Sequence, residues 1–173
     1  MKKSVLFLAV ALALCSSQSL FAQYAKGDQL LNVGIGLNSY YSTGIPLNAS
    51  YEVGITDDIS VGGSIDFLSA KYSSFSNYKF TAIYVGVRGS YHFNKILNLN
   101  SKKADLYGGV GLGYRSFSWS DGAFSGLGDS YGSGIYLGIH LGGKYYFTDK
   151  VGGFLELGAT GATNVRIGVA FKF

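Results

Sequence analysis

The strongest constraint on this chain is an alternation of apolar with small or polar residues, at a period of two, in eight separate segments. In the last segment, Val, Ile, Val, Phe and Phe fall on one face, and Asn, Arg, Gly, Ala and Lys fall on the other. Successive side chains of a strand point to opposite faces of a sheet, so each segment is predicted to be a two-sided strand. The predicted strands are 29–38, 47–56, 59–68, 79–93, 105–118, 132–148, 151–159 and 163–173.

The connections between these segments predict how the strands are joined. The stretches 56–59 and 148–151 read Thr-Asp-Asp-Ile and Thr-Asp-Lys-Val, which predicts similar short turns at one end of an antiparallel meander. Longer connections rich in Ser, Gly and Tyr are expected at the other end, over 39–46, 69–78 and 119–131. The exception is 94–104, a longer connection on the short-turn side. Because the number of strands is even, the last can pair antiparallel with the first, which predicts an all-β, eight-stranded antiparallel up-and-down barrel.

The N-terminal segment is typical of a secretory signal peptide. Lys2 and Lys3 precede an uncharged apolar run of secretory length, and a small residue, Ala22, follows at an expected cleavage point. We therefore expect a signal peptide over 1–22 and one barrel domain over 23–173, with an uncleaved anchor as the alternative. Cleavage removes the only cysteine, Cys15, and lowers the formal charge from +4 to +2. A thiol nucleophile, a cysteine-bound metal and nucleic-acid binding are then not expected.

Alternation alone does not say which face of the barrel lies inside. A membrane barrel turns its apolar face outward, whereas a soluble secreted ligand-binding barrel turns it inward. Only 14% of the residues are charged, against about a quarter in ordinary soluble domains. The polar face is mostly Gly, Ser, Asn and Tyr rather than the dense charged coat of a soluble exterior. These features favour a transmembrane β-barrel, with the soluble barrel as the competing class.

Aromatic residues gather toward both ends of the predicted strands, which matches the two aromatic girdles of a membrane barrel. One predicted girdle lies at the short-turn and C-terminal end, and the other lies toward the long loops. The residues are Tyr91, Phe93, Tyr145, Phe147, Phe171 and Phe173 at the first end, and Phe67, Phe80, Tyr114 and Trp119 at the second.

The C-terminal pattern Gly168-x-x-Phe171-x-Phe173 resembles the assembly signal of bacterial outer-membrane β-barrels, although Ile167 stands where that signal usually has a polar residue. The chain from residue 23 onward is similar to the eight-stranded barrels of the outer membrane protein A and X type. This resemblance implies insertion by the barrel-assembly machinery and contact with lipid and lipopolysaccharide in a Gram-negative outer membrane.

The polar face predicts a charged interior. An eight-stranded barrel is only wide enough for side chains to fill it, and buried charges need partners. We expect a belt of inward charges formed by Glu52, Arg88, Lys144, Glu156 and Arg166. If the turns are three residues long, Lys144 lies opposite Glu156, and Glu156 lies opposite Arg166. The inference is a largely filled lumen with a structural or surface-interaction role, and the alternative is a small gated porin-like channel.

Catalysis is the third class considered. The two histidines are predicted at the short-turn end (His92) and mid-strand (His140), away from the outer rim where related lipid-modifying barrels place theirs. No metal-ligand spacing or dinucleotide fingerprint is present. We therefore expect no enzyme and no cofactor, and a host or surface ligand, if any, at the loops 39–46, 69–78 and 119–131.

Overall fold

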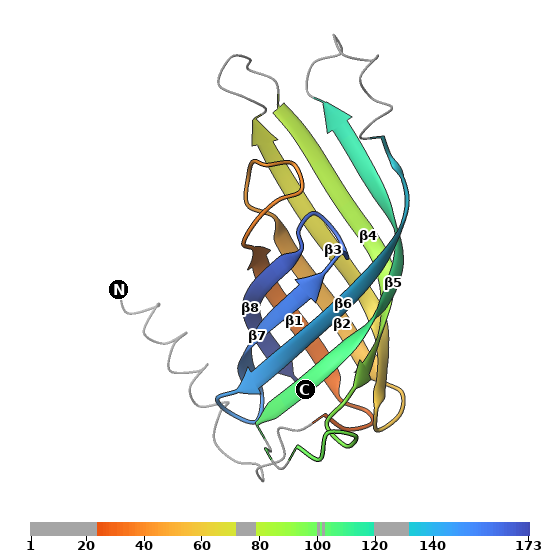
Figure 1. Cartoon of the computed structure of the whole chain (residues 1–173), viewed down its shortest axis with the longest axis vertical. Helices are drawn as coiled ribbons and strands as arrows, with labels where there is room; N and C mark the ends of the chain where they lie inside the picture. Colours follow the sequence, from red (N-terminus) through yellow and green to blue (C-terminus); the bar gives the residue numbers. More distant parts are fainter. Residues whose placement is uncertain (1–23, 72–78, 100, 102, 120–131) are drawn as a thin grey trace, which may run out of the picture.

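Eight antiparallel strands close into a barrel in the computed structural model, which describes residues 24–71, 79–99, 101, 103–119 and 132–173 (Figure 1). The strands are β1 (Gln29–Gly36), β2 (Leu47–Gly54), β3 (Ile59–Lys71), β4 (Lys79–His92), β5 (Ala104–Trp119), β6 (Gly134–Tyr146), β7 (Val151–Gly158) and β8 (Val165–Lys172). No helix in these ranges is long and apolar enough to cross a membrane. The expected signal peptide, 1–22, lies outside the described residues.

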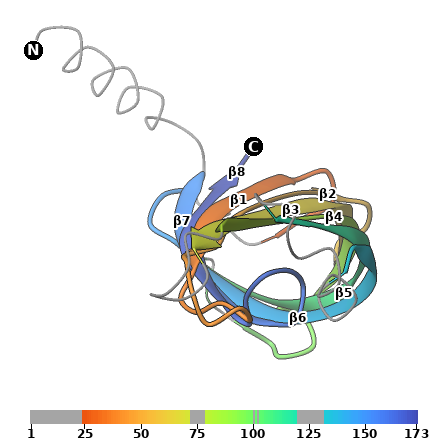
Figure 2. The same cartoon turned by 90° about the horizontal axis from the view of Figure 1, so that it is seen from above.

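The barrel closes because β1 pairs with β2 on one side and with β8 on the other. Leu30 lies opposite Glu52 in the first ladder and opposite Lys172 in the second. Figure 2 shows the resulting ring from above. The predicted strand number and up-and-down order are confirmed.

The two ends of the barrel differ. The turns 55–58 and 147–150 and the connection 93–103 lie at one end, which we call the turn end; the other connections lie at the loop end. Strands β3 to β6 have 13 to 16 residues, whereas the other four have 8. The long strands therefore rise above the β7–β8 loop at the loop end (Figure 1).

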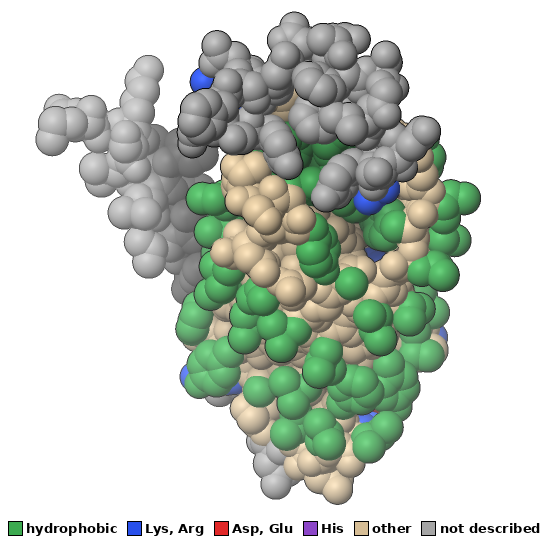
Figure 3. All heavy atoms as spheres, turned by 45° about the horizontal axis from the view of Figure 1, so that its top comes forward, with side chains coloured by type: hydrophobic (Ala, Val, Ile, Leu, Met, Phe, Trp, Pro, Cys, Tyr) green, Lys and Arg blue, Asp and Glu red, His purple; other side chains and the backbone are tan. Residues whose placement is uncertain are grey.

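The apolar face of the barrel is the outer face. Leu137 and Ile135 are 81% and 80% exposed, whereas Glu52 and Arg88 on the polar face are 1% and 5% exposed. Hydrophobic side chains spread over the wall that is visible in Figure 3. A soluble ligand-binding barrel would need the reverse arrangement. The exposed apolar side chains of the strands include Val33, Ile35, Leu47, Val61, Ile65, Val85, Val87, Val110, Leu112, Ile135, Leu137, Ile139, Leu141, Leu155, Leu157, Ile167 and Val169.

This polarity inverts on the tall wall formed by the loop-end parts of β3, β4 and β5. Beyond the exposed Phe67 and Tyr114, the outward residues become polar, while the inward residues form a small apolar cluster. Phe80 belongs to this cluster and is 1% exposed, so its predicted place in the outer aromatic girdle was wrong. Successive residues of a strand point to opposite faces, and the neighbouring Thr81 points outward, so Phe80 points into the lumen. The cluster contains Leu68, Ala70, Phe80, Ala82, Tyr84 and Ala162, with Tyr41, Phe117 and Tyr136 packed against it.

Candidate functional site

The lumen holds an ion-pair network whose centre is Glu156 on β7. Arg88 Nη2 donates to Glu156 Oε2 at 2.7 Å, and Arg166 Nη1 donates to Glu156 Oε1 at 2.8 Å. The Tyr107 hydroxyl donates to Glu156 Oε2 at 3.1 Å. Glu156 lies opposite Arg166 in the β7–β8 ladder, as the turn argument predicted. One carboxylate therefore joins two guanidinium groups that come from opposite sides of the barrel.

Both arginines also reach a second carboxylate. Arg88 Nε lies 3.1 Å from Glu52 Oε1, and Arg166 Nη2 donates to Asp66 Oδ2 at 2.6 Å. The result is a continuous chain of alternating charge across the lumen, from Glu52 to Asp66. All five charged side chains are nearly inaccessible to solvent, and such charges are stable only when they are paired. Four of the five predicted belt residues are thus in one network, and Asp66 is a member that the sequence did not single out.

The loop between β7 and β8 packs against the ion-pair network on the side that faces the loop end of the barrel. The Ala162 amide donates to Asp66 Oδ2 at 3.0 Å, and Tyr40 donates from its amide to Ala162 O at 3.1 Å. A Cβ added at Gly161 would lie 1.5 Å from Asp66 Oδ2, so only glycine fits at this position. The loop 159–163 therefore covers the charged network from the loop end.

Lys144 is not opposite Glu156, and that prediction was wrong. The β6–β7 turn places Tyr146 opposite Gly152. Lys144 therefore lies opposite Phe154, and Glu156 lies opposite Gly142. The shift is two residues, so Lys144 still points inward. Its Nζ lies 4.0 Å from Asp105 Oδ2 and 4.6 Å from the centre of the Tyr107 ring.

A second polar chain runs from Asp105 toward the middle of the barrel. His92 Nδ1 lies 2.8 Å from Asp105 Oδ1, and His92 Nε2 lies 3.0 Å from Ser60 Oγ. Ser60 donates to Glu52 Oε2 at 2.9 Å, and Ser90 donates to the same oxygen at 2.6 Å. His140 Nε2 continues the chain, 2.9 Å from Ser90 Oγ. Both histidines therefore have structural partners that connect to the ion-pair network through Glu52.

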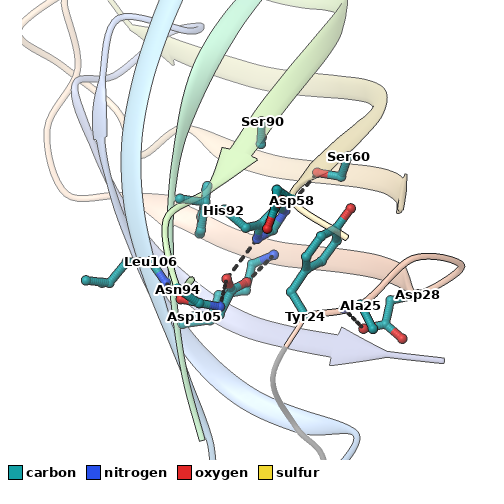
Figure 4. Close-up of polar contacts among 12 residues, drawn as sticks. Tyr24, Ala25, Asp28, Asp58, Ser60, Ser90, His92, Asn94, Asp105 and Leu106 are labelled. Carbon is teal, nitrogen blue, oxygen red and sulfur yellow. Dashed lines mark hydrogen bonds and ion pairs between the residues drawn. The ribbon is translucent and has the colours of Figure 1, made fainter. Parts of the chain in front are cut away.

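Tyr24 covers this chain at the turn end (Figure 4). Its ring stacks on His92 with centroids 3.5 Å apart and an interplanar angle of 2°, and its hydroxyl donates to Thr56 O at 2.9 Å and to Ile59 O at 2.5 Å. Burial of the ring, with a further contribution from Asp105, raises the pKa of Tyr24 well above its usual value. Tyr24 thus closes the turn end of the lumen.

The spacing of Ser60, His92 and Asp105 is that of a catalytic triad, but the hydrogen bonds differ from those of a hydrolase. A triad serine gives its only hydroxyl hydrogen to the histidine. Here the Ser60 hydroxyl hydrogen goes to Glu52, so Ser60 has none to give to His92 Nε2. The carboxylate beside Ser60 Oγ would also oppose an oxyanion, which needs hydrogen-bond donors around it. These contacts are those of a structural network.

The other predicted site residues lie on or near the outer wall. Tyr145, Phe147, Phe67 and Tyr114 are exposed, and Tyr91 and Phe93 are half-buried with ring centroids 5.4 Å apart. Trp119 ends β5, and its side chain lies outside the described part.

The residues of the expected assembly signal lie at the closing seam. Gly168 faces Gly34 across the β1–β8 ladder, and Phe171 faces Leu31. Phe173 is exposed and exchanges two backbone hydrogen bonds with Gln29. Among the described residues, no three His, Cys, Asp or Glu side chains are placed to hold a metal ion.

The fold and the polarity of the wall define an eight-stranded transmembrane β-barrel. No family model and no curated protein sequence matches the chain. Outer membrane protein OprG from Pseudomonas aeruginosa is similar in structure, with a TM-score of 0.60 and 11% identity over 88% of this chain and 99% of that chain. The N-terminal β-barrel domain of Pseudomonas aeruginosa OprF gives a TM-score of 0.52 with 16% identity over 86% and 98%.

A de novo designed transmembrane β-barrel also gives a TM-score of 0.52, with 16% identity over 86% of this chain and 97% of that chain. The resemblance to eight-stranded outer-membrane barrels is confirmed at the level of the fold.

Proposed function

We propose that this protein is an integral outer-membrane β-barrel with a filled lumen and a structural or surface-interaction role. The observation that carries the proposal is the wall, which is apolar outside and charged inside. An apolar exterior is compatible with lipid. Where all eight strands are paired, the barrel also exposes no unpaired strand edge to lipid. The turn end then faces the periplasm, because the chain enters from there, and the loop end faces outward.

The filled lumen is supported by the two polar chains. The ion pairs of Arg88 and Arg166 cross the barrel, the loop 159–163 covers them from one end, and Tyr24 covers the other end. A small gated channel would need these contacts to break together. Planar-bilayer recordings of the purified, folded protein test this point. The proposal predicts no conductance steps, and regular steps would favour the channel.

A structural role needs no catalysis, cofactor or nucleic acid. Surface interaction would use the loop end, where Tyr40 and Ile45 of the 39–46 connection are exposed. The connections 69–78 and 119–131 lie largely outside the described residues. Biogenesis by the barrel-assembly machinery would use Gly168, Phe171 and Phe173 at the C-terminal end.

Two biochemical properties test the membrane assignment. The protein should stay with membranes after carbonate or high-salt washing and should need detergent for release. On gels, the unheated protein should migrate differently from the boiled protein, because a closed barrel resists unfolding by the detergent. Release without detergent would contradict the proposal.

A further inference from the structure

The loop-end part of β6 has a neighbouring strand on one side only. β6 pairs with β5 from Gly134 onward, but it pairs with β7 only from His140 onward. Within the described part of the chain, residues 134–139 therefore have no strand partner on the β7 side, and Figure 1 shows this part of β6 above the β7–β8 loop. The missing neighbour explains why Leu137 and Ile135 are 81% and 80% exposed.

The backbone groups that point out of this edge are those of Ile135 and Leu137. In an antiparallel ladder, the N–H and C=O of one residue point to the same side, and those of the next residue point to the other side. The Ala159 amide donates to Ile139 O at 2.8 Å from the β7 side, so the backbone groups of residues 135 and 137 point to that side as well. No described residue pairs with them. Two donors and two acceptors, spaced as in a ladder, therefore face outward from β6.

The sequence of this edge lacks the features by which proteins usually protect an exposed strand edge. Such edges carry Lys, Pro or a bulge, or they are covered by a loop. Residues 134–139 read Gly-Ile-Tyr-Leu-Gly-Ile, with no charged residue and no proline. At the other edge of the tall wall, on β3, the 39–46 connection provides cover, and Thr43 Oγ1 donates to Lys71 O at 3.3 Å. The β6 edge is thus left as a template for the addition of a strand.

The position of the edge limits what can supply that strand. Ile135 lies directly opposite Tyr114 of the outer aromatic girdle, so the edge lies at the outer boundary of the apolar band, where water and extracellular polypeptides reach it. A second copy of this chain in the same membrane would be related by an axis along the membrane normal. Because strands tilt by about 35–45°, the two β6 strands would then cross at about 70–90° and could not pair. The occupant is therefore an extended segment of another polypeptide.

Arg115 on β5 indicates the charge of that segment. Its Nε and Nη2 donate to Gly132 O at 3.1 and 2.7 Å, and it contacts the Tyr84 hydroxyl, but both of these partners are neutral. Within the described residues Arg115 forms no ion pair with a carboxylate, unlike the two arginines of the ion-pair network. Gly134 lies directly opposite Arg115, and a Cβ added to Gly134 would meet nothing within 4 Å. A carboxylate on an added strand opposite Gly134 would point inward across this space toward the guanidinium, which binds carboxylates well.

We propose that the β6 edge over residues 134–137 binds an extended acidic peptide by strand addition. Apolar side chains of the peptide lie beside Ile135 and Leu137 on the outer face, and a carboxylate points inward to Arg115. The inference rests on the proposed function and names the partner class of its surface interaction, since the edge is accessible only if the loop end faces outward.

The probe is a capped synthetic peptide that contains Val-Ser-Val-Glu, which places valines opposite residues 137 and 135 and the glutamate opposite residue 134. One matched peptide carries Gln in place of Glu, and a second carries N-methyl groups on both valines, which removes the backbone donors. The readout is residue-specific amide hydrogen exchange, followed by NMR on the full barrel in phosphatidylcholine nanodiscs. Three protein variants are compared with the wild type: Arg115→Gln, Ile135→Pro and the control Lys103→Gln, which removes a charge from an exposed position at the turn end.

Without peptide, the amides of Ile135 and Leu137 should exchange quickly, whereas those of Tyr136 and Gly138, which point to β5, should be protected. The Glu peptide, at about ten times its dissociation constant, should slow the exchange of the first two amides by about tenfold. The N-methylated peptide should give no protection. The Glu peptide should bind about two- to fivefold more tightly than the Gln peptide, as for an exposed ion pair.

Arg115→Gln should abolish this preference for Glu, and the control Lys103→Gln should keep it. Ile135→Pro removes one N–H on the open side, without touching the β5 ladder, and should weaken peptide binding by about two- to tenfold. If this variant does not fold, the N-methylated peptide on the wild type makes the same test. Equal protection by the N-methylated peptide, an unchanged preference in Arg115→Gln or its loss in the control would overturn the site. Protection without peptide that grows with protein concentration would assign the edge to a second copy instead.

The gel-mobility difference between unheated and boiled protein separates this result from a failure of the proposed function. A wild type that shows the mobility difference but gains no protection from the Glu peptide would overturn the peptide site and leave the membrane barrel intact. A wild type without the mobility difference would instead contradict the proposed function itself.

Discussion

Replacing Glu156 with glutamine tests the ion-pair network at its centre. The carboxylate is 3% exposed and accepts hydrogen bonds from Arg88, Arg166 and Tyr107. Removing one partner of a buried ion pair costs about 3–5 kcal/mol, because the other charge stays buried without compensation. Each arginine keeps one other carboxylate, Glu52 or Asp66, so we expect a loss of about 3 kcal/mol in the free energy of unfolding, at the lower end of that range.

The assay is urea-dependent folding into lipid vesicles, followed by the gel-mobility difference of the folded barrel. The matched control is Asp57→Asn, which makes the same chemical change where the pair with Lys95 is exposed, and it should cost less than about 1 kcal/mol. The double variant Glu156→Gln/Arg88→Gln should lose less than the sum of the two single variants, since it removes the buried charge that the first change leaves unpaired. Equal losses for Glu156→Gln and Asp57→Asn would refute the reasoning.

Three further substitutions follow from the geometry, with the same unfolding assay as readout. Tyr24→Ala removes a buried ring stacked on His92 and should lower the free energy of unfolding by about 3–5 kcal/mol, because this ring closes the turn end; no loss would contradict this. Gly161→Ala should destabilise the barrel, since its Cβ would overlap the Asp66 carboxylate, whereas Gly134→Ala, with nothing within 4 Å of the added Cβ, should not. Val87→Arg places a charge on the outer wall and should cost about 2–4 kcal/mol in vesicles; a neutral result would mean that this wall does not face lipid.

The sequence alone predicts much of the fold because alternation determines the face on which each side chain lies. The eight strands and the inward position of Glu52, Arg88, Lys144, Glu156 and Arg166 all follow from parity. Register does not follow from parity, since a shift of two residues leaves every side chain on the same face. Lys144 was therefore given the wrong partner, and its contact with Asp105 depends on turn geometry that residue pattern does not determine.

The polar chain at the turn end depends on contacts between residues far apart in the sequence, and a local residue pattern does not predict such contacts. Tyr24 lies 68 positions before His92 in the chain, and Asp66 meets Ala162 and Arg166 from the opposite side of the barrel. The inversion of polarity above Phe67 had a sequence signal, since Phe80 has the parity of inward residues. It was missed because aromatic residues near strand ends were all expected to face lipid.

The central claim is that the apolar face of the barrel meets lipid while the polar face lies inside. Site-directed spin labels test it most directly, since the chain from residue 23 onward contains no cysteine to be removed. Labels placed one at a time over residues 136–141 of β6, in proteoliposomes, should alternate in their accessibility to oxygen. Leu137, Ile139 and Leu141 should collide with oxygen dissolved in the bilayer and not with a water-soluble nickel reagent. Positions 136, 138 and 140 should be protected from oxygen. Outward labels that collide with the nickel reagent, or an absence of alternation, would contradict the account.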